Sequence, residues 1–268
     1  MQQNLHAAAQ RCLLATDITE KLDLATRLFA DWRAGRLCAE PVELPDVVEP
    51  GRPARPVLVP PSRVPRRRLG SREGRAALIH AVAHIEFNAI NLACDAVWRF
   101  QGLPDAYYGD WLQVAAEESR HFALLQARLR KLGHDYGDFP AHDGLWELAL
   151  QTRDDPLRRM ALVPRVMEAR GLDVTPGMME RFAQIGDQET VAILGIILED
   201  EIGHVEAGSR WFRHLCEARG LDPEQHYFEL LEQAFVGGIR CPLHREARLE
   251  AGFSESELDR LEALCKKS

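Results

Sequence analysis

Helical periodicity dominates the pattern of hydrophobic and polar positions along the chain. Apolar residues recur at every third or fourth position through four long segments, residues 71–100, 105–132, 155–170 and 188–219. This spacing places the apolar side chains in one stripe along a helix. Segments with the strict alternation of a strand are few. The pattern therefore predicts an all-α protein.

Shorter apolar stripes predict additional helices outside these four segments. They cover two helices within residues 1–35 and one each at 142–151, 175–185, 222–235 and 254–265. Local signals set the ends: Ser71 is a good N-cap, and Gly102 with Pro104 closes the helix that Ser71 starts. Pro164 is expected to kink the third long helix and Gly171 to end it.

Residues 41–70 have a different character, because eight prolines exclude regular helix and sheet interior. They predict an extended strap. Its basic patch is favoured as solvated charge over a nucleic-acid contact, and comprises Arg63, Arg66, Arg67 and Arg68. The predicted domains are residues 1–70 (terminal helices and strap), 71–236 (a four-helix bundle) and 237–268 (a tail helix).

The composition of the chain argues against several classes of protein. The chain has 268 residues, 46% of them hydrophobic, and a net charge of −8, which argues against bulk binding to nucleic acid or anionic membranes. Six scattered cysteines without CxxC spacing are typical of reduced thiols in a cytoplasmic protein. The N-terminus lacks a signal-peptide pattern, and we expect no membrane-spanning segment.

Each of the four long stripes carries a potential metal ligand. These are Glu86 in the first, Glu118 and His121 in the second, Glu168 in the third, and Glu201 and His204 in the fourth. Residues three apart share one helix face, but a single Glu-x-x-His is weak evidence in a chain with ten histidines. The repeat is more specific. The two halves are offset by 82 residues for Glu86 and Glu168, and by 83 for each member of the Glu-x-x-His pairs.

Four carboxylates facing one another in an apolar bundle would be very costly unless cations neutralised them. Two divalent ions would do so, and one imidazole for each ion completes a ligand set suited to iron or manganese. The order of the ligands is that of ferritin-like di-iron carboxylate bundles. Acids beside the stripes are expected to be solvated or to steady a ligand; they are Glu117, Glu199 and Asp200. We expect His84 and Asp95 to be structural or exposed.

Four segments also resemble a bacterial family of ferritin-like proteins of unknown function. They are AHIEFNAIN from Ala83, EESRH from Glu117, MEARGLD from Met167 and DEIGHVEAGSRWF from Asp200. The resemblance extends over most of the chain, and all six ligand positions are present. It implies a ferritin-like fold and a di-metal centre, and it implies no particular substrate.

The sequence thus predicts a cytoplasmic di-iron protein that uses dioxygen to oxidise or hydroxylate an unknown small molecule. Manganese, or one ion of each metal, is the alternative metal content, and no catalytic residue is predicted beyond the ligands. An electron donor is required, and a homodimer is one assembly considered. The alternative functions are a tRNA-modifying hydroxylase, an iron-binding ferroxidase without organic substrate, and a helical module with a structural metal.

Overall fold

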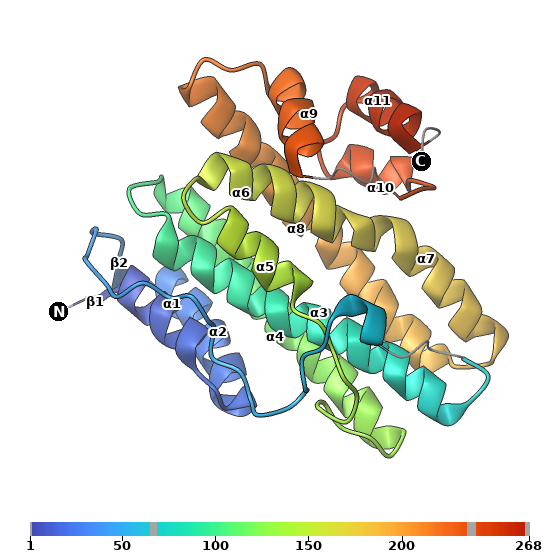
Figure 1. The fold of residues 1–268 in the computed structure, drawn as a ribbon. Helices are drawn as coiled ribbons and strands as arrows, with labels where there is room; N and C mark the ends of the chain where they lie inside the picture. The colour runs from blue at the N-terminus through green and yellow to red at the C-terminus, as the bar shows by residue number, and fades with distance from the viewer. Residues whose placement is uncertain (1, 65–68, 235–239, 266–268) are drawn as a thin grey trace. The chain divides into compact units, whose positions relative to one another are not determined.

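The computed structural model describes residues 2–64, 69–234 and 240–265. The chain divides into two compact units, Met1–Leu150 and Gln151–Ser268, and Figure 1 shows that helices build both of them. The all-α prediction is confirmed. The basic residues Arg66, Arg67 and Arg68 of the strap lie outside the described residues.

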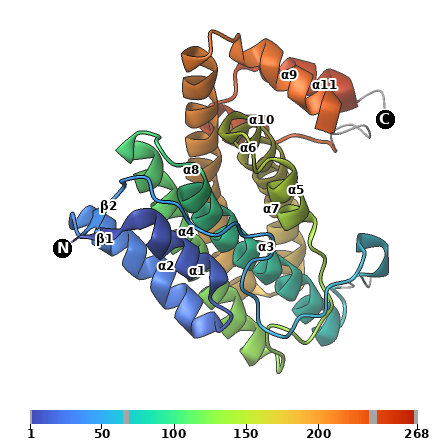
Figure 2. The ribbon, with the colours of Figure 1, turned by 60° about the vertical axis from the view of Figure 1, so that its left-hand side comes forward.

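Four helices form the body of the first unit. They are α1 (Leu5–Leu14), α2 (Ile18–Arg33), α3 (Arg72–Arg99) and α4 (Asp105–Lys131). The long helices α3 and α4 pack along each other, α1 packs on α3, and α2 packs on α4 (Figure 2). A short parallel pair of strands, β1 (Gln3–Asn4) and β2 (Leu37–Cys38), ties the N-terminus to the end of α2. The unit ends in α5 (Gly144–Gln151).

A buried lysine fastens α1 to α2 and α3. The Lys21 Nζ donates to the carbonyls of Cys12 and Leu13, both at 2.9 Å, and to the Asn91 Oδ1 at 2.7 Å. The last carbonyls of a helix have no partner within its regular turns, and here Lys21 adds a charged donor to two carbonyls that also accept from the backbone N–H groups of Ala15 and Gly51. Burial lowers the pKa of Lys21 to about 8.

The described part of the strap up to residue 64 is extended, as predicted, apart from the short 3-10 turn η1 (Pro61–Arg63). Backbone hydrogen bonds hold it on the first unit: Gly51 N donates to the Leu13 carbonyl, and Val59 N donates to the Ala141 carbonyl, each over 2.8 Å. A Cβ on Gly51 would meet the Leu14 carbonyl oxygen at 2.2 Å, so only glycine allows this approach.

The second unit contains the remaining helices. They are α6 (Pro156–Leu162), the π-helix η2 (Val163–Glu168), α7 (Ala169–Gln184), α8 (Gln188–Ala218), α9 (Pro223–Ala234), α10 (Arg245–Glu250) and α11 (Glu255–Cys265). The long helix α8 packs against α6, η2 and α7.

Two boundaries predicted in this unit are wrong. Gly171 does not end a helix and Pro176 does not start one, because both lie inside α7. Pro164 acts differently from a simple kink. Proline lacks the N–H of a regular α-helical turn and its ring needs room, and here the chain widens into a π-helix. Pro164 packs on α8 at Gly208, where a Cβ would lie 2.3 Å from the proline ring.

Within the second unit, buried ion pairs hold α10 and α11 on α7 and η2. Arg165 donates to Glu257 over 2.6 Å and is stacked among aromatic rings, and Arg248 pairs with Asp173 at 2.7 Å. At the start of the predicted terminal helix, α11, Ser254 and Glu257 cap each other's backbone N–H and form a capping box.

The expectation that all six cysteines are reduced thiols is wrong. Cys241 and Cys265 form a disulfide with a Cα–Cα distance of 5.9 Å, whereas Cys12, Cys38, Cys94 and Cys216 are free thiols. The spacing of 24 residues gave no signal, because the fold of α10 and α11 brings the two thiols together.

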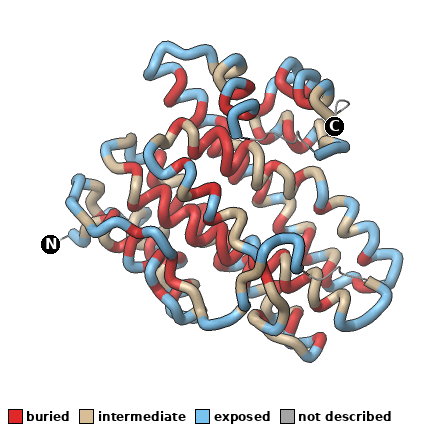
Figure 3. Tube along the Cα trace, viewed as in Figure 1, coloured by how far each residue is buried: buried red, intermediate tan, exposed pale blue. Residues whose placement is uncertain are grey.

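By length and composition, α3 could cross a membrane, contrary to the expectation that no segment would pass this test. However, 78% of its apolar window is buried within the protein, as in the core helix of a folded domain. Figure 3 shows the long buried stretches of the helices. The cytoplasmic location stays a prediction.

Candidate metal centre

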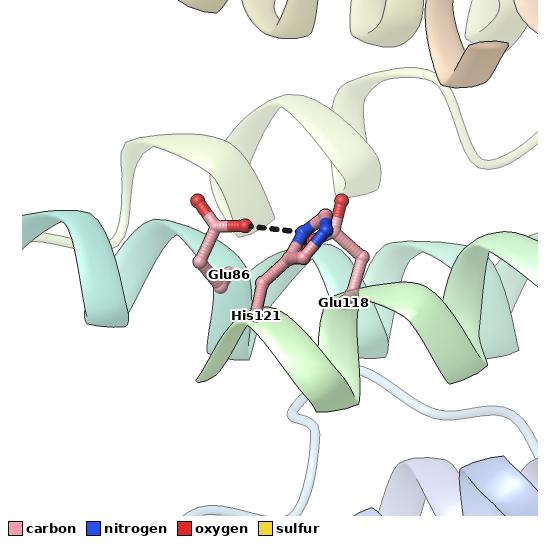
Figure 4. A group of neighbouring side chains, drawn as sticks. All are labelled: Glu86, Glu118 and His121. Carbon is pink, nitrogen blue, oxygen red and sulfur yellow. Dashed lines mark hydrogen bonds and ion pairs between the residues drawn. The ribbon is translucent and has the colours of Figure 1, made fainter. Parts of the chain in front are cut away.

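Three of the predicted ligands meet in the first unit. Glu86 comes from α3, and Glu118 and His121 lie one turn apart on α4 (Figure 4). The His121 Nδ1 lies 3.1 Å from the Glu86 Oε2 and 3.5 Å from the Glu118 Oε2. One donor atom from each residue lies within 4.8 Å of the other two, and all three residues are buried. This arrangement can hold a divalent cation.

Burial and mutual contacts shift the pKa values of Glu86 and His121. Desolvation, followed by the charge of Glu118, raises the pKa of Glu86 to about 8. Burial alone would lower the pKa of His121, but hydrogen bonds to Glu118 and Glu86 raise it to about 11. Without a metal, the group thus retains protons to balance its negative charge, and a bound cation would replace them.

An aromatic cluster flanks these ligands. The rings of Phe87 and Phe122, the sequence neighbours of Glu86 and His121, lie 5.6 Å apart. Tyr136 packs against both, at 5.5 Å from Phe87 and 4.9 Å from Phe122, and its hydroxyl lies 2.8 Å from the His84 Nδ1. Burial lowers the pKa of His84 to about 4. Sequence reasoning missed Tyr136, because its approach depends on how residues 132–143 fold back.

In the second unit, Glu201 and His204 lie one turn apart on α8, and both are buried. The His204 Nδ1 is 3.9 Å from the Glu201 Oε2, which repeats the arrangement of Glu118 and His121. Glu168 is the last residue of η2, which packs on α8, and its side chain is half-buried. Three of the six predicted ligands thus lie in each unit.

The other acids and histidines behave largely as expected. Glu117 accepts a hydrogen bond from Gln113 at 2.9 Å on the exposed side of α4, and Glu199 is exposed. Asp200 is half-buried. Asp95 is buried and pairs with Arg99 at 2.9 Å, and His84 is held by Tyr136, so both are structural.

The described residues therefore define an all-helical protein with a buried Glu/Glu/His group that could hold a metal ion. The chain belongs to the family described as "Protein of unknown function (DUF455)", whose model matches residues 14–259. It is similar to an "Uncharacterized protein" of Haemophilus influenzae, with 50% identity over 216 residues that cover 77% of this chain and 74% of the relative. No solved structure matches the chain significantly.

Proposed function

We propose that this chain is a di-metal carboxylate protein that uses dioxygen to oxidise or hydroxylate a small organic molecule. In this proposal α3, α4, η2 with α7, and α8 together form a ferritin-like four-helix bundle. The bundle holds two iron ions, with manganese or one ion of each as the alternative. The observation that carries the proposal is the buried meeting of Glu86, Glu118 and His121.

The donor set fits a divalent first-row metal. Carboxylate oxygens and an imidazole nitrogen are the ligands that iron and manganese take in proteins. Buried carboxylates are costly without a compensating charge, and the raised pKa of Glu86 expresses that cost. A divalent cation would relieve it, so the burial of these groups is consistent with a site selected to bind metal rather than to stabilise the apoprotein.

We infer a second ion from the predicted ligands in the second unit. Its Glu-x-x-His pair on α8 repeats the pair on α4 at an offset of 83 residues, and Glu168 follows Glu86 at an offset of 82. Such a repeat is expected if each half supplies one imidazole and two carboxylates to a shared pair of ions. The six residues proposed as ligands are Glu86, Glu118, His121, Glu168, Glu201 and His204.

Bound ferrous iron would supply electrons for the activation of dioxygen. The chain would hold the ions in place, and the rings of Phe87 and Phe122 would exclude water beside Glu86 and His121. Before a metal binds, Glu86 and His121 must give up the protons that burial and hydrogen bonding retain. Metal affinity is therefore expected to rise with pH.

Metal analysis of protein purified without added chelator tests the proposal. The wild type is expected to carry about two ions per chain, and Glu118→Gln and Glu201→Gln are each expected to lower this content. Glu117→Gln is the matched control, because Glu117 neighbours Glu118 but bonds to Gln113 on the exposed side. Unchanged metal content in both ligand variants would refute the metal site.

Titration of the ferrous protein with dioxygen then separates the functions. If the protein consumes dioxygen and still holds two ions afterwards, the result supports oxidation of a substrate. Growth of a mineral beyond two ions per chain would point to iron storage, and an inert site would point to a structural metal.

A further inference from the structure

Oxidisable aromatic rings form a continuous chain of contacts in the first unit. The protein has five tryptophans and four tyrosines, and four of these residues, Trp32, Tyr108, Tyr107 and Trp111, touch in that order. The ring centroids are 6.3 Å apart from Trp32 to Tyr108, 5.6 Å from Tyr108 to Tyr107 and 6.2 Å from Tyr107 to Trp111. We refer to these four rings as the aromatic chain.

The two ends of the aromatic chain differ in their surroundings. Trp32 lies on α2 and is half-exposed, and a Cβ on Gly109 would sit 3.3 Å from its Nε1, so the indole rests directly on α4. Trp111 is buried on α4, seven residues before Glu118. Seven residues are two helical turns, so Trp111 lies on the face of Glu118 at about 10 Å along the helix.

The middle of the aromatic chain is built to pass an electron without trapping a radical. The Tyr108 hydroxyl donates to the Phe100 carbonyl at 3.1 Å and accepts from Leu103 N at 3.0 Å. A carbonyl oxygen is not a base, and burial raises the pKa of Tyr108. An oxidised Tyr108 therefore cannot pass its proton to the carbonyl that it bonds, so it would recover an electron rather than persist as a neutral radical.

We infer that the aromatic chain conducts oxidising equivalents from the metal site to the protein surface at Trp32. This inference rests on the proposed function, because the oxidant is dioxygen. Two ferrous ions would supply two of the four electrons that reduce it to water, and without a bound substrate the other two would arrive one at a time through the aromatic chain, with protons from solvent. The aromatic chain would protect the metal ligands from oxidation when dioxygen is reduced without a substrate.

Each transfer moves one electron inward. Trp111 gives an electron to the oxidant at the metal site, and Trp32 replaces it through the rings of Tyr107 and Tyr108, which act as a bridge. The oxidised Trp32 recovers its electron from an external reductant of the thiol or ascorbate class, whose proton passes to solvent. Only electrons move between the rings, so no bond to hydrogen forms or breaks in them.

A tryptophan that serves packing alone looks different. Trp146 is buried like Trp111, but its Nε1 donates to the Val48 carbonyl at 2.8 Å and fastens the strap. Its ring stacks on none of the four rings of the aromatic chain within the part of the protein that the structure describes. It is therefore a suitable matched control.

Metal-free protein provides the first test. A rhenium(I) tricarbonyl photo-oxidant is attached to the thiol that the substitution Gln113→Cys introduces on α4, in a Cys38→Ser background that removes the partly exposed free thiol. After flash excitation, the indole radical is followed by transient absorption and oxidised tryptophan is located by peptide mass spectrometry. Helical circular dichroism checks the fold of each variant.

Trp111→Phe is expected to slow the oxidation of Trp32 about tenfold, which corresponds to about 1.4 kcal/mol in activation free energy. Trp146→Phe is expected to leave it unchanged. Equal rates in the wild type and Trp111→Phe would overturn the inference. Because no metal is present, this result does not depend on the proposed function.

The second test exposes the ferrous protein to dioxygen without substrate. Trp32 is expected to be the main oxidised tryptophan, and Trp111→Phe is expected to lose this modification and to accumulate oxidation at His121. Dioxygen consumption with an unmodified Trp32 in the wild type would overturn the inference. If no dioxygen is consumed, the proposed function fails, and the photo-oxidation result alone decides whether the rings conduct.

Discussion

Substitution of Glu86 by glutamine is expected to flatten the pH dependence of stability in the metal-free protein. Burial, and then the charge of Glu118, raises the pKa of Glu86 from 4.5 to about 8. The folded state therefore retains this proton up to about pH 8, whereas the unfolded chain releases it near pH 4.5. The stabilisation is fully present below the lower pKa and is lost as the pH rises through the higher one.

The size of the effect follows from the two pKa values. One pKa unit corresponds to about 1.4 kcal/mol, so the wild type should lose about 3–5 kcal/mol of unfolding free energy across this interval through Glu86. Glutamine carries no ionisable proton and abolishes this contribution. His121 adds a loss of the same sign, because hydrogen bonds to Glu118 and Glu86 raise its pKa to about 11 despite burial. Part of the slope therefore remains in the variant.

Urea unfolding in the presence of EDTA, at about pH 5 and about pH 8, measures the difference. Glu117→Gln serves as the control and should lose as much stability as the wild type. If Glu86→Gln loses as much stability as the wild type between the two pH values, Glu86 does not hold its proton in the folded protein and the electrostatic reasoning fails. Adding a divalent metal should reverse the slope, because binding requires deprotonated ligands.

Three other substitutions test how the helices are held. Gly208→Ala places a Cβ 2.3 Å from the Pro164 ring and should cost about 1–3 kcal/mol in thermal unfolding; an unchanged midpoint would contradict the close approach. Lys21→Met removes the donor to the Cys12 and Leu13 carbonyls and should cost about 1–3 kcal/mol, with faster amide exchange at the end of α1; unaltered exchange there would count against it. Ser254→Ala should cost about 1 kcal/mol in urea unfolding, and no loss would show that the capping box contributes little.

The long helices could be predicted because their signals are local. The apolar stripe and the Ser71 N-cap predicted a helix over residues 71–100, and α3 spans Arg72–Arg99 with Ser71 Oγ accepting from Gly74 N. Pro164 and Gly171 led to wrong predictions in the third segment, because tertiary contacts outweigh their tendency to break a helix. Pro164 is accommodated by Gly208, and the pairing of Asp173 with Arg248 holds the first turns of α7. Neither partner is near in the sequence, so local signals could not reveal them.

The candidate site was predictable only in part for a similar reason. Helical spacing places Glu118 and His121 on one face, and the stripe of α3 turns Glu86 toward the neighbouring helix, so their meeting could be foreseen. The approach of Tyr136 could not, because it depends on the connection after α4. The pairing of Cys241 with Cys265 likewise depends on how the tail folds.

The contact between Pro164 and Gly208 also affects how relatives of this chain would be compared. A proline inside a helix usually kinks or breaks it, and a glycine in the middle of a long helix costs about 1 kcal/mol relative to alanine. Here the proline at position 164 requires a glycine at position 208, since any side chain at position 208 would overlap the proline ring. We expect the two positions, 44 residues apart, to change together among relatives. A relative that keeps the proline but replaces the glycine would need a different packing of η2 on α8.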